Sequence, residues 1–166
     1  MVVLLCGGLL QAQASVRSEY EVKAAFLYNF TRFINWNEPP SEDVPLTVCV
    51  LGNDPFEDLL EPLVGRRAHG RFLQLRAPNS RSDIDGCHVL YISQSESSYL
   101  PAILDEATRQ GMLTISDIPG FAQRGGIVGY VKQGNVIRFE INLLAANAAG
   151  LNINSRLLEL AAKVIR

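Results

Sequence analysis

The sequence predicts a single α/β domain, a layered sandwich with a mainly parallel sheet, a C-terminal β-hairpin and two closing helices. Short apolar runs rich in β-branched residues alternate with stretches of helical character, which is typical of βαβ units. Two alternating runs near the C-terminus flank a turn-forming segment, residues 132–135, and predict the hairpin. The chain has 166 residues, of which 48% are hydrophobic, and this is enough for one domain with a substantial core.

The first fourteen residues differ from the rest of the chain. Met1–Ala14 carries no charge and ends in Ala12-Gln13-Ala14, the small-x-small pattern of a signal-peptidase site. The usual basic segment before the apolar run is missing. We interpret residues 1–14 as a signal peptide truncated at its start, and residues 15–166 as the exported domain. A buried N-terminal strand is the alternative.

The first helix is expected over Ser18–Asn35, where Ser18 and Glu21 form a capping-box pattern. Its main apolar face on a helical projection is formed by Val22, Ala25, Phe26, Phe30 and Phe33. Leu27 and Ile34 lie on a second stripe. That stripe either covers another part of the domain or docks a partner.

Four strands are expected, of which the first, an apolar run rich in β-branched residues, suits a buried strand. They are Leu46–Leu51, Phe72–Leu75, Cys87–Ser93 and Met112–Ile115. A short helix, Phe56–Leu60, is expected after the first strand, because Asp54 can cap it and Pro55 suits its first turn. A longer helix is expected from Ser97 or Ser98 to Gln110.

The C-terminal third predicts the hairpin and the two closing helices. Ile127–Val131 and Val136–Ile141 are the hairpin strands. A helix over Asn142–Ala149 is expected to end at Gly150. A last helix is expected to begin at Asn154 or Ser155 and to place Leu157, Leu160, Ala161 and Val164 on one face.

The charge pattern argues against several classes of partner. The formal net charge is −2 and there is no basic block, which argues against nucleic acid and against anionic membrane surfaces. No apolar run is long enough to span a membrane. Five arginines, Arg66, Arg67, Arg71, Arg76 and Arg81, give one region a local positive bias. This bias indicates either a solvated face or a site for an acidic partner.

Removal of the signal peptide would leave two cysteines, Cys49 and Cys87. An even number in an oxidising compartment favours one disulfide. The alternatives are two buried free thiols, or a metal site in which the cysteines converge with His88 and His69. No CxxC or HxxxH spacing supports the metal site.

The motifs of common enzymes are missing: there is no G-x-S-x-G elbow, no Walker A and no H-E-x-x-H. We therefore predict that the chain is not an enzyme, and we expect no metal and no cofactor. The unusual polar set is Arg138, Glu140 and Asn142, which share one face of a predicted strand. Glu140 either locks the hairpin, by bonding Arg138 or backbone N–H groups, or lines a pocket.

Several stretches together resemble a known family. They are Lys23–Phe30 with Trp36, Val48–Gly52 with Pro55 and Phe56, Gly111–Asp117, Phe121, Gly125 and Gly126, Val136–Asn142, and Ser155–Ala161. In order and spacing they look like the YfiR-like family of periplasmic proteins. The resemblance runs from about Tyr20 to Arg166.

The resemblance implies a periplasmic α/β domain without known catalysis. It implies repression of an inner-membrane diguanylate cyclase through the cyclase's periplasmic sensor domain, which controls cyclic-di-GMP and biofilm formation. An OmpA-like outer-membrane lipoprotein would relieve the repression by sequestering the repressor. The other hypothesis is a periplasmic small-molecule-binding sensory module without a cyclase partner. A homodimer stays an open expectation.

The resemblance also bears on particular residues. Cys49 and Cys87 match the disulfide positions of the family, whereas the second cysteine pair of some members, in the region of Ala122 and Gly129, is missing. As candidate contacts to a partner or ligand we select Leu27, Ile34, Phe121, Arg138 and Glu140.

Overall fold

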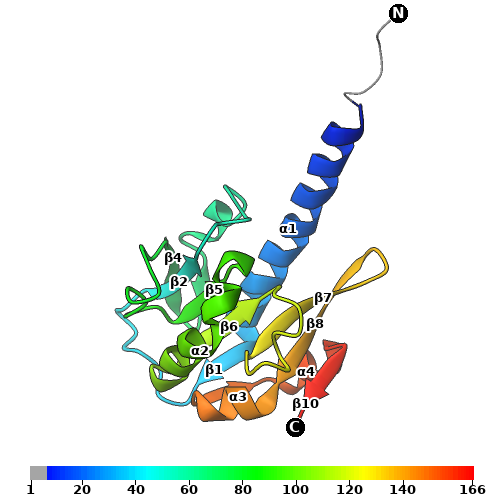
Figure 1. The fold of residues 1–166 in the computed structure, drawn as a ribbon. Helices are drawn as coiled ribbons and strands as arrows, with labels where there is room; N and C mark the ends of the chain where they lie inside the picture. Colours follow the sequence, from blue (N-terminus) through cyan, green and yellow to red (C-terminus); the bar gives the residue numbers. More distant parts are fainter. Residues whose placement is uncertain (1–6) are drawn as a thin grey trace, which may run out of the picture.

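The structure, a computed structural model, describes residues 7–166. Side chains are described at residue 13 and from residue 15 onward. A long helix, α1 (Gly7–Phe33), crosses one face of a central sheet, and its N-terminal end projects beyond the body of the domain (Figure 1). The expected signal peptide falls partly outside the described residues. From Gly7 onward its residues are already part of α1.

The central sheet has eight strands in the order β10-β8-β7-β6-β5-β2-β4-β3. Their bounds are β2 Leu46–Leu51, β3 Arg67–Ala68, β4 Arg71–Arg76, β5 Val89–Ile92, β6 Leu113–Ser116, β7 Val128–Gln133, β8 Val136–Asn142 and β10 Lys163–Ile165. The pairs from β4 through β2, β5 and β6 to β7 are parallel, while β7 and β8 form an antiparallel hairpin. The predicted α/β class, with its mainly parallel sheet, is confirmed.

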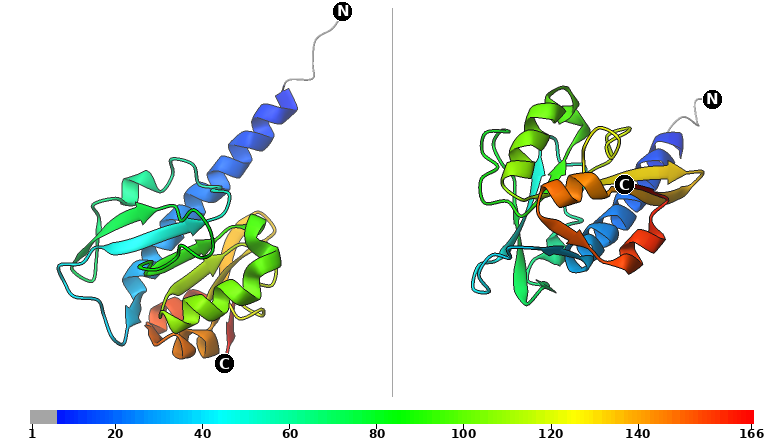
Figure 2. Two further views of the ribbon diagram at one scale, coloured as in Figure 1. Left: turned by 60° about the vertical axis from the view of Figure 1, so that its left-hand side comes forward. Right: turned by 90° about the horizontal axis from the view of Figure 1, so that it is seen from below.

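Two apolar cores lie on opposite faces of this sheet, because alternate side chains of each strand point to opposite sides. On one face, Val48 and Tyr91 pack with Leu27 and Phe30 of α1. On the other face, Leu51 and other strand residues pack against α2 (Leu100–Arg109), which follows the 3-10 helix η2 (Gln94–Tyr99). Figure 2 shows α1 and α2 on either side of the sheet. The predicted layered arrangement is therefore confirmed.

The predicted disulfide forms in the core on the α2 side. Cys49 of β2 is bonded to Cys87, with 5.8 Å between the two Cα atoms. The metal and free-thiol alternatives for these cysteines are thereby wrong. The histidines have other partners: His88 Nδ1 accepts a hydrogen bond from the backbone N–H of Thr47, and a ring nitrogen of His69 lies 2.9 Å from the carbonyl oxygen of Ile34.

The first helix differs from its prediction at both ends. It runs through Ser18, so the expected capping box does not form. It ends at Phe33 because the next residues form β1 (Ile34–Trp36), which pairs with β9 (Leu151–Ile153) in a second, two-stranded sheet. The buried face is also rotated from the predicted one. Leu27 and Ile34 are fully buried, whereas Val22 is 42% exposed.

The segment after β2 forms turns in place of the predicted helix over Phe56–Leu60, and a 3-10 helix, η1 (Glu61–Leu63), follows. Asp54 still caps a backbone group, because its Oδ1 accepts a hydrogen bond from the N–H of Phe56. The cap therefore stabilises a local turn, and the chain passes on to the sheet before a helix can extend.

The two hairpin strands are each one residue longer than predicted, whereas the two closing helices are shorter. The hairpin pairs up to Gln133 and Val136, which leaves a two-residue Gly-Asn turn. The α3 helix (Leu143–Ala148) is capped by the side chain of Asn142. The α4 helix (Ser155–Leu160) ends early because β10 pairs in parallel with β8. Leu160, predicted to share one face with Leu157, is 62% exposed, whereas Leu157 is buried.

None of the helices within residues 7–166 is both long enough and apolar enough to cross a membrane.

Candidate functional site

A buried ion pair fixes α1 over the sheet. Lys23 of α1 is only 3% exposed, and its Nζ lies 2.7 Å from Asp117 Oδ2 and 2.7 Å from Glu19 Oε1. Asp117 follows β6 directly, so its carboxylate stands at the carboxyl end of the parallel strands. The hydroxyl of Tyr20 donates a second hydrogen bond to the same Asp117 oxygen, at 2.5 Å. We call Lys23, Asp117, Glu19 and Tyr20 the anchor cluster.

Tyrosine rings surround the anchor cluster. The Lys23 ammonium lies 4.2 Å from the ring centroid of Tyr20, at a cation–π distance. The hydroxyl of Tyr130 on β7 donates to the carbonyl oxygen of Lys23 at 2.6 Å, which ties the hairpin to the same turn of α1. The Tyr91 hydroxyl is buried and makes no hydrogen bond of good geometry within the described part of the chain.

The cluster keeps its carboxylates charged. Burial acts to raise the pKa of Asp117, but hydrogen bonds from Lys23 and Tyr20 outweigh it and hold that pKa below its usual value. The pKa of Glu19 is lowered in the same way, since Lys23 and Lys132 outweigh its partial burial. Burial and the neighbouring Asp117 charge raise the pKa of Tyr20, so its hydroxyl keeps its proton and donates. Both carboxylates of the cluster are therefore charged at neutral pH.

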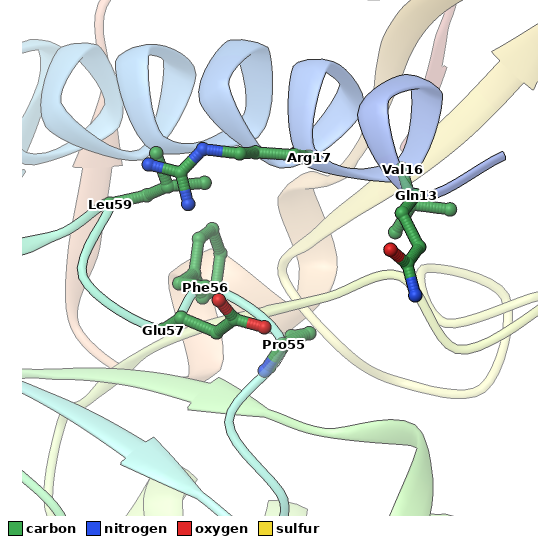
Figure 3. A pocket seen from close by; sticks show the side chains of 7 residues that line it. All are labelled: Gln13, Val16, Arg17, Pro55, Phe56, Glu57 and Leu59. Carbon is green, nitrogen blue, oxygen red and sulfur yellow. The ribbon is translucent and has the colours of Figure 1, made fainter. Parts of the chain in front are cut away.

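A hollow of about 540 Å³ lies between the projecting part of α1 and the loop after β2 (Figure 3). Its lining residues are Gln13, Val16, Arg17, Pro55, Phe56, Glu57 and Leu59. The ring of Phe56 points from the loop toward α1 and makes edge-to-face contacts with Tyr20 and Tyr91, at centroid distances of 5.3 and 4.8 Å. The floor of the hollow therefore rests on the anchor cluster.

The loop beneath this hollow contains a strained residue. Glu57 has a φ of 54°, in the left-handed region that side chains other than glycine rarely occupy. Such backbone strain persists only where the surroundings enforce it, and it is concentrated at functional sites.

A second hollow of about 430 Å³ continues along α1 and shares Leu59 with the first. Its lining residues are Glu21, Ala24, Ala25, Tyr28, Asn29, Arg32, Leu59, Leu63 and Arg66. The Arg17–Asp58 ion pair, 3.0 Å long, joins α1 to the loop where the two hollows meet. We call the two hollows together the α1 groove.

The five candidate contact residues do not come together in this groove. Leu27 and Ile34 are 0% exposed and Phe121 is 2% exposed, so all three are core residues in this conformation. Leu27 and Ile34 belong to the core on the α1 side and Phe121 to the core on the α2 side, so a partner would reach them only if these cores opened. Their assignment as contacts stays a prediction, with packing as the role that the structure describes.

Arg138 and Glu140 lie partly exposed on β8, away from the lining of the groove. Glu140 accepts a hydrogen bond from Gln123 Nε2 at 2.7 Å, and Arg138 contacts the side-chain oxygen of Gln133. The third residue of that predicted set, Asn142, is buried and donates to the carbonyl oxygen of Ala122. Glu140 thus ties β8 to the segment before β7, and its direct pairing with Arg138 is not among the contacts of the described residues.

Comparison with known families gives a match to the model described as YfiR/HmsC-like over residues 20–162, which is most of the chain. The chain belongs to the YfiR/HmsC-like family. The predicted resemblance is therefore confirmed. At the level of the family, this membership supports a periplasmic regulator of cyclase signalling, in a regulatory and non-catalytic family.

Solved structures with the same fold are distant in sequence. A conserved domain protein from Vibrio cholerae O1 biovar El Tor is similar with a TM-score of 0.54 at 15% identity, covering 72% of this chain and 54% of that one. The ABC domain in complex with L-Trp from Streptococcus pneumoniae gives a TM-score of 0.53 at 13% identity, covering 72% and 55%. This YfiR/HmsC-like chain therefore spans about half the length of either solved chain. No curated protein sequence matches it.

Lys23 and Asp117 both lie in the stretches that resemble the YfiR-like family, but their pairing was not predicted from the sequence. The signal was a lysine inside the apolar pattern of α1 and an aspartate directly after a buried strand. Because the two residues are 94 positions apart, only the packing of α1 on the sheet brings them together. The α1 groove was missed for the same reason.

Proposed function

We propose that the chain is a periplasmic regulatory binding protein that represses an inner-membrane diguanylate cyclase through the cyclase's periplasmic sensor domain. By this action it would control cyclic-di-GMP and biofilm formation, and an OmpA-like outer-membrane lipoprotein would release the repression by binding the repressor. The observation that carries the proposal is the YfiR/HmsC-like match over residues 20–162.

The structure contributes a surface for such a contact. The α1 groove is open and partly apolar, and Val16 of α1, which is 55% exposed, is one of its lining residues. Exposed apolar groups along a rigidly held helix suit contact with another protein. On β8, Arg138 and Glu140 are the two of the five candidate contacts that are partly exposed, so a partner reaches them without opening the core.

The proposal is tested in the organism that carries the gene. We expect deletion to raise cellular cyclic-di-GMP, and we expect in-cell cross-linking of the tagged chain to recover an inner-membrane cyclase. Glu140→Ala tests the β8 contact, with Glu159→Ala on exposed α4 as a matched control. Unchanged cyclic-di-GMP after deletion, with no membrane partner recovered, would sink the proposal. Light scattering of the purified protein tests the separate expectation of a homodimer.

The second candidate function is a small-molecule-binding sensory module. The hollow of Figure 3 favours it, because its floor residue Phe56 follows β2 at the carboxyl end of the parallel strands. The strands β2 and β5 are neighbours in the sheet, and the chain continues from β2 to β4 on one side and from β5 to β6 on the other. Open α/β sheets bind ligands at such a switch point. The similar fold from Streptococcus pneumoniae was solved with L-Trp.

This second function predicts binding without a protein partner. Amino acids and other small periplasmic metabolites are screened by thermal shift on the purified chain. Val16→Trp, which fills the hollow from the exposed side of α1, should remove any shift. If a ligand raises the melting temperature of the wild type and of Val16→Trp equally, its binding site lies outside this hollow.

A further inference from the structure

We propose that the Arg32–Arg66 end of the α1 groove binds a carboxylate of an extended acidic segment presented by the partner protein. The inference rests on the proposed function in one respect, that the chain works by binding another protein. It adds the chemistry of the segment that is bound and the residues that select it.

Two guanidinium groups share one aromatic ring at this end of the groove. The guanidinium carbon of Arg66 lies 5.2 Å from the ring centroid of Tyr28, and that of Arg32 lies 5.6 Å from the same centroid. The Tyr28 hydroxyl donates to the carbonyl oxygen of Arg67 at 3.1 Å, which fixes the ring between α1 and β3. The two cations therefore lie against one ring and line the same hollow, although their elements are far apart in the sequence.

These cations lack the carboxylate partners that other basic residues have. Arg17 pairs with Asp58 and Arg76 with Asp83, whereas within the described chain neither Arg32 nor Arg66 lies in an ion pair. Arg67, next in sequence, stacks at 4.1 Å on exposed Phe72 and adds positive charge nearby. A carboxylate bound in this hollow would lie near both positive charges, and opposite charges favour its ionised form. Guanidinium groups also match carboxylates in geometry, by paired hydrogen bonds.

The shape of the groove suits an extended peptide. Its residues on α1 run from Gln13 to Arg32, which at about 1.5 Å per helical residue is a length of roughly 29 Å. An extended segment of about eight or nine residues, at about 3.3 Å each, would cover it.

The lining of the groove orients that peptide. The walls between its ends are apolar, with Ala24, Leu59 and Leu63. The Glu21 carboxylate, which lines the groove from α1, lies 3.7 Å from Arg17 Nε and is paired with that cation. The arginines without partners lie at the far end, and the acidic group of the bound segment belongs there.

A displayed library of random peptides, selected on the full-length oxidised chain, tests this directly. We expect the enriched peptides to contain Asp or Glu beside apolar residues. By calorimetry, the best peptide should lose affinity at least about tenfold in Arg32→Gln/Arg66→Gln, because charge-assisted hydrogen bonds are lost. Replacing its acidic residues by amides should have a similar effect. Both arginine side chains are exposed, so the variant should fold normally.

Control variants separate the geometry from net charge. Arg156→Gln, exposed on α4 and outside the groove, should leave the affinity within about twofold. Arg32→Lys/Arg66→Lys keeps the charge but loses the planar fork, and should bind with intermediate affinity. Enrichment of peptides without acidic residues, or equal binding by the glutamine variant, would overturn the proposal. So would no enrichment at all, or competition by free glutamate at the peptide's own concentration, which would indicate a site for small carboxylates.

The outcomes also separate this inference from the proposed function. If deletion of the gene leaves cyclic-di-GMP unchanged while the arginine-dependent peptide binding persists, the cyclase proposal fails and the acidic-segment site stands. If deletion raises cyclic-di-GMP and the glutamine variant still represses and binds peptide normally, the site fails and the regulatory role stands.

Discussion

At the scale of single residues, the Lys23 ammonium is tolerated inside this domain because it has two carboxylates and a tyrosine ring around it. A buried charge without a partner costs several kcal/mol, so the two sides of the pair depend on each other. Lys23 and Asp117 belong to α1 and to the end of β6, and their pairing sets where α1 lies on the sheet. The position of the α1 groove follows from that contact.

The first prediction concerns removal of one partner. Asp117→Asn should lower the free energy of unfolding by about 3 kcal/mol, near the low end for a broken buried pair because Glu19 still neutralises Lys23. Urea denaturation at pH 7 measures this. The double variant Lys23→Met/Asp117→Leu leaves no unpaired charge and should cost less than Asp117→Asn alone. If the double variant loses as much free energy of unfolding as Lys23→Met and Asp117→Leu lose in sum, the two residues are not coupled.

The second prediction concerns pH. The pKa values of Asp117 and Glu19 are lowered in the folded state from ordinary values of 3.8 and 4.5, so the folded chain binds fewer protons than the unfolded chain as the pH falls. The two carboxylates contribute their full share to the free energy of unfolding at pH values above 4.5. That share is lost as the pH falls through the lowered pKa values of the folded state. Urea midpoints from pH 7 to pH 3 should therefore converge for the wild type and Asp117→Asn. If the difference between the two urea midpoints stays constant from pH 7 to pH 3, the charge of Asp117 does not contribute to stability.

At the scale of elements, the segment before β7 folds back on itself at very short range. A Cβ atom at Gly126 would lie 2.0 Å from a ring carbon of Phe121, which is 2% exposed. The glycine is thus required by the buried ring, and both belong to the stretches that carried the family resemblance. Phe121 belongs to the core on the α2 side of the sheet, and Gly126 leaves the space that its ring occupies.

The third prediction follows from this contact. Gly126→Ala should destabilise the domain by about 1–3 kcal/mol, as overpacking of a close-packed core does. Thermal or urea unfolding measures the change. In a Phe121→Leu background the same substitution should cost clearly less, because the smaller side chain leaves room for the methyl group. Equal costs in the two backgrounds would mean that the strain lies in the backbone at Gly126.

The elements also show what local sequence can predict. The strands β2, β4, β5 and β6 were predicted within one or two residues at each end, because short apolar runs bounded by turn residues identify strands. The strands β1, β9 and β10 were missed, since each has three residues and forms only by pairing with a distant segment. The buried face of α1 was misplaced because its apolar residues nearly encircle the helix, and the sheet decides which of them face inward.

At the scale of the whole molecule, the one disulfide of the described chain encloses the loop that forms a wall of the α1 groove. Cys49 and Cys87 are 38 residues apart, and the closed loop contains Pro55–Arg66 together with β3 and β4. The bridge could be predicted from cysteine number and from the family resemblance. The groove could not, because its two walls meet only in the folded chain.

The last prediction connects the bridge with the groove. Cys49→Ala/Cys87→Ala should lower the free energy of unfolding by about 2–4 kcal/mol, because the unfolded chain gains the freedom that the closed loop had lost. The strained loop at Glu57 belongs to that enclosed segment, so we expect its amides to exchange hydrogen faster in the variant while those of α2 change less. Hydrogen exchange with mass spectrometry measures both regions in one experiment. A reductant should weaken the wild type and leave the variant unchanged. If both proteins unfold at the same urea concentration and exchange alike, β2 and β5 hold the loop without the bridge, and the groove is independent of the oxidation state of the chain.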